Sequence, residues 1–339
     1  MFKRLFQKRP TEPRKKWQVP KILEHSEVVF DDDGLRARIC IGNRARICIG
    51  NTDHLIVTFP TYGESFDDVP YENDTAFQSS CAPQGERTML HITDKTAHWL
   101  LGPGEFTRAV DVIKSQVEKI QPRQISLVGN SAGGTMALMV APHLDVVNRV
   151  IAISPQTGLG IFHQFSDRRF RKWLSPILLQ TVHPNWLFHA LDKVERAYIF
   201  HGLASADGKH STVVPNSEHV HHYIFPKFSH SLAQEIKEFV PLADLMNRCL
   251  SDDIPGLGQL CDSIGGARRG HAFSEDALHA HSNVQGYDRF VEWDKKMTSQ
   301  RKRDGLQTIH QRIVSERKGL VTEPASTSDT ERFLAGALL

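Results

Sequence analysis

The sequence has no long apolar run and no marked excess of charge of either sign. No stretch approaches the roughly 18–20 apolar residues that a membrane-spanning helix requires. The basic N-terminus is not followed by the apolar segment of a secretory signal. The chain has 41 basic and 39 acidic residues, which gives a net charge of +2. That balance argues against a nucleic-acid partner.

Cysteines are few and show no paired spacing. There are five of them, an odd number, without a Cys-x-x-Cys motif: Cys40, Cys48, Cys81, Cys249 and Cys261. This pattern is typical of reduced thiols rather than of a disulfide framework, so we expect a cytoplasmic protein. Histidines are many, 18 in all, but His219, His221 and His222 lack a Cys or carboxylate at metal-ligand spacing. We therefore expect no metal and no other cofactor.

Short apolar segments of strand length alternate with segments of helical spacing through the middle of the chain. The expected strands are 54–59, 88–93, 124–128, 150–154, 197–201 and 223–226. The expected helices are 106–120, 134–142 and 231–246. This alternation predicts an α/β fold with a mostly parallel sheet and helices on both of its faces.

Changes in composition suggest the domain boundaries. A basic tail at residues 1–20 precedes an α/β domain at residues 21–249. Within that domain the aromatic-rich stretch 158–192 is expected to form a small cap over the strand ends. Residues 250–339 are expected to form a polar C-terminal appendage that is partly helical or disordered.

An eight-residue duplication lies before the first of the expected parallel strands. The segment RARICIGN occupies residues 36–43 and is repeated letter for letter at 44–51. Because eight is an even period, Ala37 and Ala45 would face the same side if both copies are strands. The Gly-Asn pair that ends each copy suits a two-residue turn, so we expect an antiparallel meander that leads into strand 54–59.

The segment ISLVGNSAGGTMAL carries the strongest functional signal. A strand ends in Gly129-Asn130-Ser131-Ala132-Gly133, and a helix of small and apolar residues follows. This is the G-x-S-x-G nucleophile elbow, in which Ser131 is the expected nucleophile. The turn is so tight that side chains at Gly129 and Gly133 would collide, and the serine itself is strained.

An elbow serine needs an acid and then a base further along the chain, in that order. Asp207 follows the strand AYIFHG, and His230 follows the strand YIFP and precedes a helix. His230 would take the proton of Ser131, and Asp207 would fix the imidazole tautomer. Asp192 and Glu218 are the alternatives for the acid.

An oxyanion hole needs two converging N–H donors. The first donor is expected from Ala132, directly after the nucleophile. The second is expected from the loop after Phe59, where Pro60 has no N–H and Thr61 or Tyr62 remain as candidates.

Taken together, these segments resemble the α/β-hydrolase superfamily, and within it the bacterial hydrolase-like proteins associated with cell-surface glycan synthesis. The resemblance covers about residues 25–247 and rests on VTFPTYGES, MLHITDKTAHWLLG, ISLVGNSAGGTMALMVAP, VIAISPQTGLG, SDRRFRKW, IFHGLASADG and FPKFSHSLA. It implies Ser131, Asp207 and His230 as a catalytic triad. Asn130, Ala132 and Thr135 depart from the usual pattern of relatives, which bears on substrate preference.

These observations predict a serine hydrolase that cleaves or transfers acyl groups through an acyl-enzyme. The expected substrate is a small-molecule or glycan ester. The alternative is a catalytically silent scaffold of the same fold in a glycan-synthesis or membrane-associated assembly, because fold alone does not establish function. The sequence does not predict an oligomeric state.

The N-terminal tail leads to a first prediction. Residues 1–18 carry seven cations, and Phe2, Leu5 and Phe6 lie beside them. A solvated tail is the simpler interpretation, and weak contact with a membrane surface is the alternative. A solvated tail leaves the full chain in the supernatant when anionic vesicles are pelleted at low salt. Pelleting that is lost on deletion of residues 1–18, with ester turnover unchanged, would establish the membrane contact instead.

Overall fold

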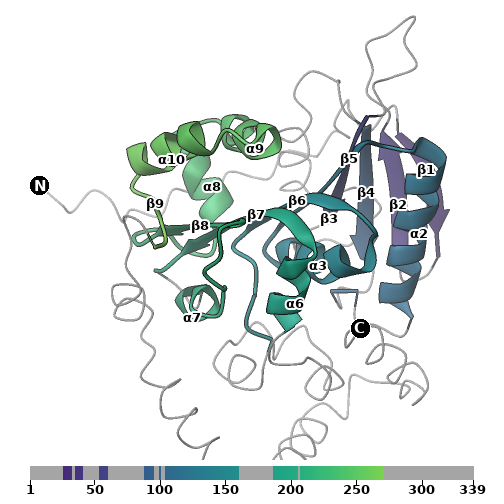
Figure 1. Ribbon diagram of the computed structural model, residues 1–339, viewed down its shortest axis with the longest axis horizontal. Helices are drawn as coiled ribbons and strands as arrows, with labels where there is room; N and C mark the ends of the chain where they lie inside the picture. Colours follow the sequence, from purple (N-terminus) through teal and green to yellow (C-terminus); the bar gives the residue numbers. More distant parts are fainter. Residues whose placement is uncertain are drawn as a thin grey trace, which may run out of the picture.

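The computed structural model describes residues 26–32, 35–40, 53–59, 88–94, 99–100, 104–159, 186–204 and 207–270. These residues form one nine-stranded sheet in the order β1-β2-β4-β3-β5-β6-β7-β8-β9 (Figure 1). Its strands are β1 (Ser26–Asp31), β2 (Leu35–Cys40), β3 (His54–Phe59), β4 (Thr88–Asp94), β5 (Gln124–Asn130), β6 (Val147–Ile153), β7 (Val194–Gly202), β8 (Val220–Phe225) and β9 (Ala267–Arg268).

The middle of the sheet is parallel and its ends are antiparallel. Strands β4, β3, β5, β6, β7 and β8 run parallel to one another. The pairs β1–β2, β2–β4 and β8–β9 are antiparallel. The predicted mostly parallel α/β fold is therefore confirmed.

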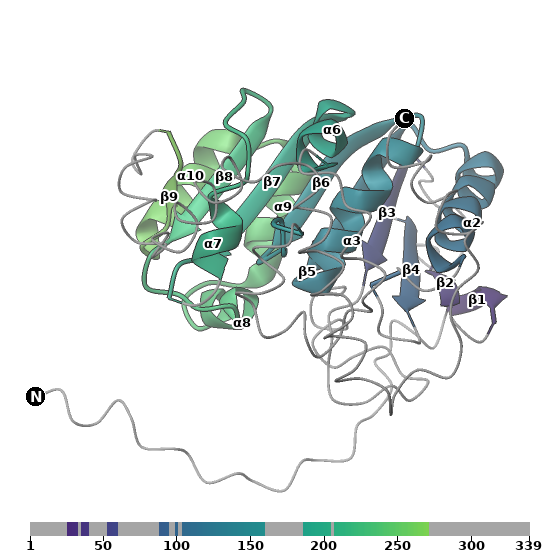
Figure 2. The same ribbon diagram turned by 90° about the horizontal axis from the view of Figure 1, so that it is seen from below.

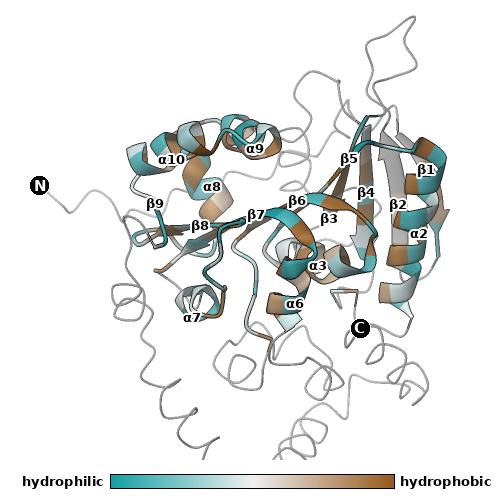
Figure 3. Cartoon of the chain, in the orientation of Figure 1, coloured by the Kyte–Doolittle hydropathy of each residue, from teal (hydrophilic) through white to brown (hydrophobic). Residues whose placement is uncertain are grey.

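Helices cover both faces of this sheet. The helical elements are α2 (Glu105–Ile120), α3 (Ala132–Val140), η3 (Ala141–His143), α6 (Trp186–Asp192), α7 (Asp207–Ser211), α8 (Leu232–Lys237), α9 (Leu242–Ser251) and α10 (Ile254–Ser263). Figure 2 shows α2, α3, α6 and α7 on one face, with α9 and α10 behind the sheet. Hydropathy is mixed along the helices that face water on one side (Figure 3).

Burial explains why the strands are apolar without alternation. Every side chain of β8 is buried, as are all those of β3 after His54. One core cluster joins the sheet to α2, α3 and α6, and a second joins it to α8, α9 and α10. A strand with a helical layer on each face has no solvated side, so both sets of side chains are buried and most of them are apolar.

The first copy of the duplicated segment contributes strand β2. The strand pairs with β1 and β4, whereas β3 pairs with β4 and β5. The predicted meander therefore does not lead directly into β3, because β4 occupies the edge of β3 that faces β2. Residues 41–52, which include the whole second copy, lie outside the described residues, so the hairpin turns stay a prediction.

The helix predicted at residues 231–246 is two helices. Helix α8 ends at Lys237, and α9 begins at Leu242 after Pro241. Proline lacks an N–H and its ring clashes with the preceding turn, so a single helix cannot run through this position. Pro241 instead takes the extended conformation of an N-cap, with φ −59° and ψ 127°.

The predicted boundary between residues 249 and 250 requires correction. It falls inside α9, and β9 adds a strand to the edge of β8. Asp252 accepts hydrogen bonds from Arg149 of β6, at 3.1 Å, and from the Tyr198 hydroxyl of β7. The α/β domain therefore continues at least to residue 270. The segment IPGLGQL belongs to α10, which buries Leu257. Its two glycines and its proline are unfavourable in helices, so the sequence did not predict this helix.

The structure describes only the two ends of the predicted cap at 158–192. Residues 160–185 lie outside the described part of the chain. Residues 186–192 form α6, whose Leu187 and Leu191 are buried in the same core cluster as α3. That end of the stretch belongs to the helical layer on the sheet. Within the described ranges, no helix has the length and apolar content to cross a bilayer.

Because α10 packs against the core, a core substitution in it should lower stability, although α10 lies beyond the expected domain boundary at residues 249 and 250. Leu257 is fully buried in the second core cluster. Leu257→Ala should lower the free energy of unfolding by about 2–5 kcal/mol, because it leaves a cavity in a packed core. Urea unfolding measures the change. Gln259→Ala, at an exposed position of the same helix, should stay within about 0.5 kcal/mol of wild type. Equal effects of the two changes would show that α10 adds nothing to the core.

Candidate active site

Ser131 stands alone between β5 and α3. Strand β5 ends at Asn130 and α3 begins at Ala132, so the chain reverses at one residue with φ 54° and ψ −123°. A positive φ is strained for a residue with a Cβ. The Ser131 N–H donates to the Ile153 carbonyl at 2.7 Å, and the Ser131 carbonyl accepts the Thr135 N–H at 3.1 Å. These bonds hold the strained turn from both sides.

Gly129 makes this turn sterically possible. A Cβ placed on Gly129 would lie 2.1 Å from both the carbonyl carbon and the carbonyl oxygen of Gly133. Backbone atoms cannot move aside as a flexible side chain can, so only glycine fits. The close approach expected between Gly129 and Gly133 is present.

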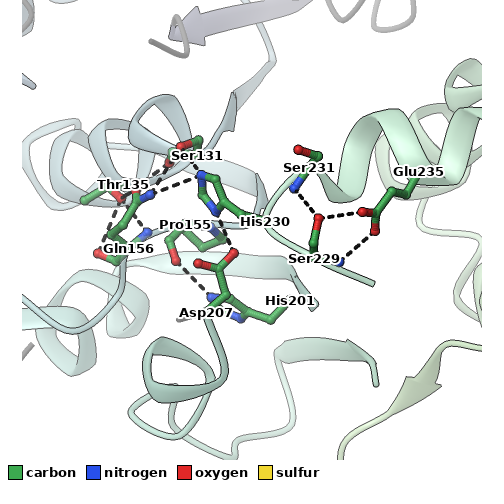
Figure 4. Close-up of polar contacts among 10 residues, drawn as sticks. All are labelled: Ser131, Thr135, Pro155, Gln156, His201, Asp207, Ser229, His230, Ser231 and Glu235. Carbon is green, nitrogen blue, oxygen red and sulfur yellow. Dashed lines mark hydrogen bonds and ion pairs between the residues drawn. The ribbon is translucent and has the colours of Figure 1, made fainter. Parts of the chain in front are cut away.

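Three side chains from separate elements meet at the carboxyl ends of the parallel strands (Figure 4). The Ser131 Oγ lies 2.7 Å from His230 Nε2, and His230 Nδ1 lies 2.6 Å from Asp207 Oδ2. A carboxylate can only accept, so Nδ1 carries the proton and Nε2 accepts the serine hydroxyl. The Asp207 side chain is fully buried, and that of His230 is 28% exposed.

The alternative acids do not occupy this position. Asp192 at the end of α6 and Glu218 before β8 are both exposed. Asp207 is the carboxylate that contacts the histidine ring.

The loop that carries His230 is held by Glu235 of α8. Its carboxylate accepts the Ser229 N–H at 2.7 Å and also the Ser229 hydroxyl. The loop also lies against the end of β7, where a Cβ on Gly202 would be 2.3 Å from the Phe228 carbonyl oxygen. Neither Glu235 nor Gly202 was identified from the sequence, because each acts on backbone that is several residues or a whole strand away.

The expected oxyanion donors are only partly within the described residues. Ala132 is the first residue of α3 and is fully buried. N–H groups in the first turn of a helix have no partner within the helix and point toward its N-terminus. Strand β3 ends at Phe59, whose register partner is Gly129 of the elbow. Thr61 and Tyr62 lie outside the described residues, so the second donor stays a prediction.

Gln156 lies beside Ser131 and was not predicted from the sequence. It follows β6 and is 1% exposed. Its Nε2 lies 3.2 Å from Ser131 Oγ and 3.5 Å from His230 Nε2. Its backbone N–H donates to Thr135 Oγ1 at 2.8 Å, and the Thr135 hydroxyl lies 3.3 Å from Gln156 Oε1. Thr135 and Gln156 therefore form a pair that joins α3 to the loop after β6.

A chain of hydrogen bonds between buried polar groups holds the loop after β6. His201 Nε2 lies 2.9 Å from the Pro155 carbonyl, and its Nδ1 lies 3.0 Å from His222 Nε2. His222 Nδ1 is 3.4 Å from Arg269 Nη1, which also donates to the Val214 carbonyl at 2.6 Å. Arginine can only donate, so His222 is protonated on Nε2 and His201 likewise, with His201 donating to Pro155.

Burial keeps both of these histidines neutral. It lowers the pKa of His201 to about 4, against the opposing effect of nearby Asp207. Burial also lowers the pKa of His222 well below its usual value, and His201 and Arg269 add to the effect. Within the ranges that the structure describes, no group of three His, Cys, Asp or Glu side chains is arranged to hold a metal ion.

The strained serine between strand and helix, with a histidine and a buried carboxylate in line, has the geometry expected of a nucleophile elbow on a mostly parallel sheet. A family model described as "Alpha/beta hydrolase family" matches residues 49–227, more than half of the chain. The chain belongs to the α/β hydrolase family. No protein of curated function matches it.

Several solved structures are similar in fold. Est1E from Butyrivibrio proteoclasticus is 14% identical with a TM-score of 0.43, over 69% of this chain and 99% of that one. The Glycosylation Associate Protein (Gap123) complex from Streptococcus agalactiae is 14% identical with a TM-score of 0.47, over 68% of this chain and 47% of that one. Esterase 2 of Thermogutta terrifontis is 15% identical with a TM-score of 0.43, over 75% and 98%. At these identities, the chemistry of this chain has to come from its own residues.

The neutral buried histidines predict a pH-dependent stability. Because the pKa of His201 is lowered from 6.5 to about 4, the unfolded chain binds protons between these values that the folded chain does not. The part of the free energy of unfolding that depends on the neutral state of these histidines is therefore full above about pH 6.5. It falls as the pH is lowered toward 4, by up to about 1.4 kcal/mol per pH unit for each histidine. Urea unfolding between pH 7 and pH 4.5 measures the slope.

His201→Gln should make this slope shallower, because the amide does not titrate. His189→Gln, at an exposed position of α6, is the matched control and should keep the wild-type slope. Identical slopes in all three proteins would show that His201 is not buried as a neutral group.

Proposed function

We propose that this α/β hydrolase is a serine enzyme that cleaves carboxylic esters through an acyl-enzyme on Ser131. The observation that carries the proposal is the unbroken line of hydrogen bonds from Ser131 Oγ through His230 to Asp207. The line begins at a serine held in a strained turn and ends at a fully buried carboxylate. A structural serine would need neither the strain nor the aligned base.

In the first step, Ser131 Oγ attacks the ester carbonyl while its proton passes to His230 Nε2. Asp207 is 2.6 Å from Nδ1, so it holds the reactive tautomer and stabilises the imidazolium that forms. His230 then protonates the leaving alcohol. Water or another hydroxyl compound resolves the acyl-enzyme by the reverse sequence of proton transfers.

The negative charge on the carbonyl oxygen needs donors that are in place before the reaction. The Ala132 N–H at the start of α3 suits this role, because a helix N-terminus also presents the positive end of its dipole. The second donor is proposed to come from Thr61 or Tyr62. This arrangement uses only groups of the chain itself.

The proposed substrate is a small-molecule or glycan ester, and the proposed location is the cytoplasm or a membrane surface. Two of the cysteines, Cys249 and Cys261, are buried thiols, in keeping with a reducing compartment. The side chain of His230 is 28% exposed and Ser131 is half-buried, which gives a substrate access to both reacting atoms.

The triad predicts a graded set of losses. Wild type should react once per chain with a fluorophosphonate and hydrolyse short p-nitrophenyl esters. Ser131→Ala should abolish labelling without unfolding the protein. His230→Ala should slow labelling and turnover by several orders of magnitude, and adding Ser131→Ala should cost little more, because triad members act as a unit. Asp207→Asn should reduce turnover by about 10³–10⁴-fold through the wrong imidazole tautomer.

Asp192→Asn and Glu218→Gln are the matched controls for the acid and should leave turnover unchanged. Activity that survives Asp207→Asn and falls with either control would reassign the acid alone. A folded wild-type protein that is inert to the probe and to every ester tried would reject the enzyme and favour the silent scaffold.

A further inference from the structure

The environment of Ser131 Oγ fixes the orientation of the Gln156 amide. The Ser131 hydroxyl has one proton, which it donates in a hydrogen bond to His230 Nε2 at 2.7 Å. The serine oxygen can then only accept a further hydrogen bond, so the Gln156 atom 3.2 Å away must be the donor Nε2. The Thr135 hydroxyl on the other side of the amide suits Oε1, the acceptor. The site therefore holds a buried N–H donor beside both nucleophile and base.

This donor is not needed for the attack by Ser131. Ser131 Oγ is already positioned by its turn between β5 and α3 and by its hydrogen bond to His230, whereas an incoming hydroxyl compound has no such attachment. The donor becomes useful later, because an esterified Oγ is a poorer acceptor and releases the amide N–H. The second nucleophile must then lie within reach of His230 Nε2, and Gln156 Nε2 is 3.5 Å from that atom.

We propose that Gln156 is a further catalytic residue, which donates a hydrogen bond to the water or alcohol that attacks the acyl-enzyme. This rests on the proposed function of Ser131. The oxygen of the incoming hydroxyl bonds to the acyl carbon while its proton passes to His230 Nε2. The bond between Ser131 Oγ and the acyl carbon then breaks, and His230 returns the proton to Oγ. The products are the free serine and an acid, or a new ester where the acceptor is an alcohol.

The two hydrogen bonds position the incoming oxygen before it bonds to the acyl carbon. His230 accepts its proton and Gln156 donates to its lone pair, so both position and orientation are set. Holding a reactant in the geometry of attack is a large part of enzymatic rate enhancement. The same place receives the leaving alcohol in the first step, because the two steps are the reverse of each other.

A p-nitrophenyl ester separates the two steps. The nitrophenol leaves readily without a proton, so the burst of nitrophenol reports acylation and the steady phase reports deacylation. Gln156→Met removes the donor and keeps the length of the side chain. We expect a burst rate within about twofold of wild type and a steady rate about tenfold lower, the loss of one hydrogen bond. Acyl-Ser131 should accumulate and be visible by mass spectrometry.

Added methanol or glycerol tests the acceptor directly. In wild type, part of the acyl group should pass to the alcohol, and Gln156→Met should reduce this transfer together with hydrolysis. The rate of fluorophosphonate labelling should not change, since fluoride leaves without a proton. Gln116→Met, at a buried position of α2 outside the site, is the matched control and should keep both phases.

Thr135 supplies a second route to the same result. Thr135→Val removes the hydroxyl that orients the amide and keeps the shape, whereas Thr135→Ser keeps the hydroxyl. Thr135→Val should slow the steady phase selectively, and Thr135→Ser should restore it. If Gln156→Met does not fold by circular dichroism, Gln156→Asn gives the same test, because its shorter amide cannot reach Ser131.

The possible outcomes separate the two proposals. A wild-type protein without label or turnover overturns both. An active wild type whose Gln156 variants keep the wild-type ratio of burst to steady rates overturns only the role of Gln156. An equal loss in both phases would make Gln156 an oxyanion donor, and this also overturns the inference.

Discussion

The positive φ of Ser131 is the constraint on which the site depends. Such a residue costs about 1–3 kcal/mol and persists only where its surroundings over-determine it. Here the N–H of Ser131 is bound by the Ile153 carbonyl of β6, its carbonyl begins the hydrogen bonds of α3, and Gly129 approaches the Gly133 backbone. The sheet and the helix together stabilise the strained conformation of Ser131. As a result, the Ser131 Oγ projects toward His230 from the end of a rigid strand.

Buried polar groups then extend this order away from the serine. Arg269, His222 and His201 bond in sequence to the Pro155 carbonyl, directly before Gln156. Each of these groups is buried away from water. Each hydrogen bond between them offsets part of the free-energy cost of burying the two polar groups that it joins. Arg269 follows β9, which lies in the stretch expected to be a separate appendage. That stretch therefore supports the loop beside Ser131. This explains why the fold continues beyond α9.

The features that could be predicted from the sequence are those encoded in short segments. The alternation of apolar strands and helices gave the fold class, and the elbow glycines and the Ser-Asp-His order gave the residues that the structure brings together. The features that were missed join segments far apart in the chain. Gln156 and Thr135 meet across two elements, and Glu235 binds backbone before its own helix. The glycines of α10 have poor helix propensity, and burial of Leu257 overrides it.

The pairing of a serine with a base does not by itself decide between hydrolysis and transfer. In both reactions the acyl-enzyme is the same, and what differs is the hydroxyl that reaches His230 Nε2. The groups bordering that atom therefore control the outcome more than the triad does. In this chain the border includes the buried amide of Gln156, which contacts Ser131 Oγ on one side and the Thr135 hydroxyl on the other. A donor held there favours any hydroxyl that can accept a hydrogen bond while giving up its proton. If Gln156 has the proposed role, discrimination between water and a larger alcohol would come from the space around Gln156 and not from the proposed triad.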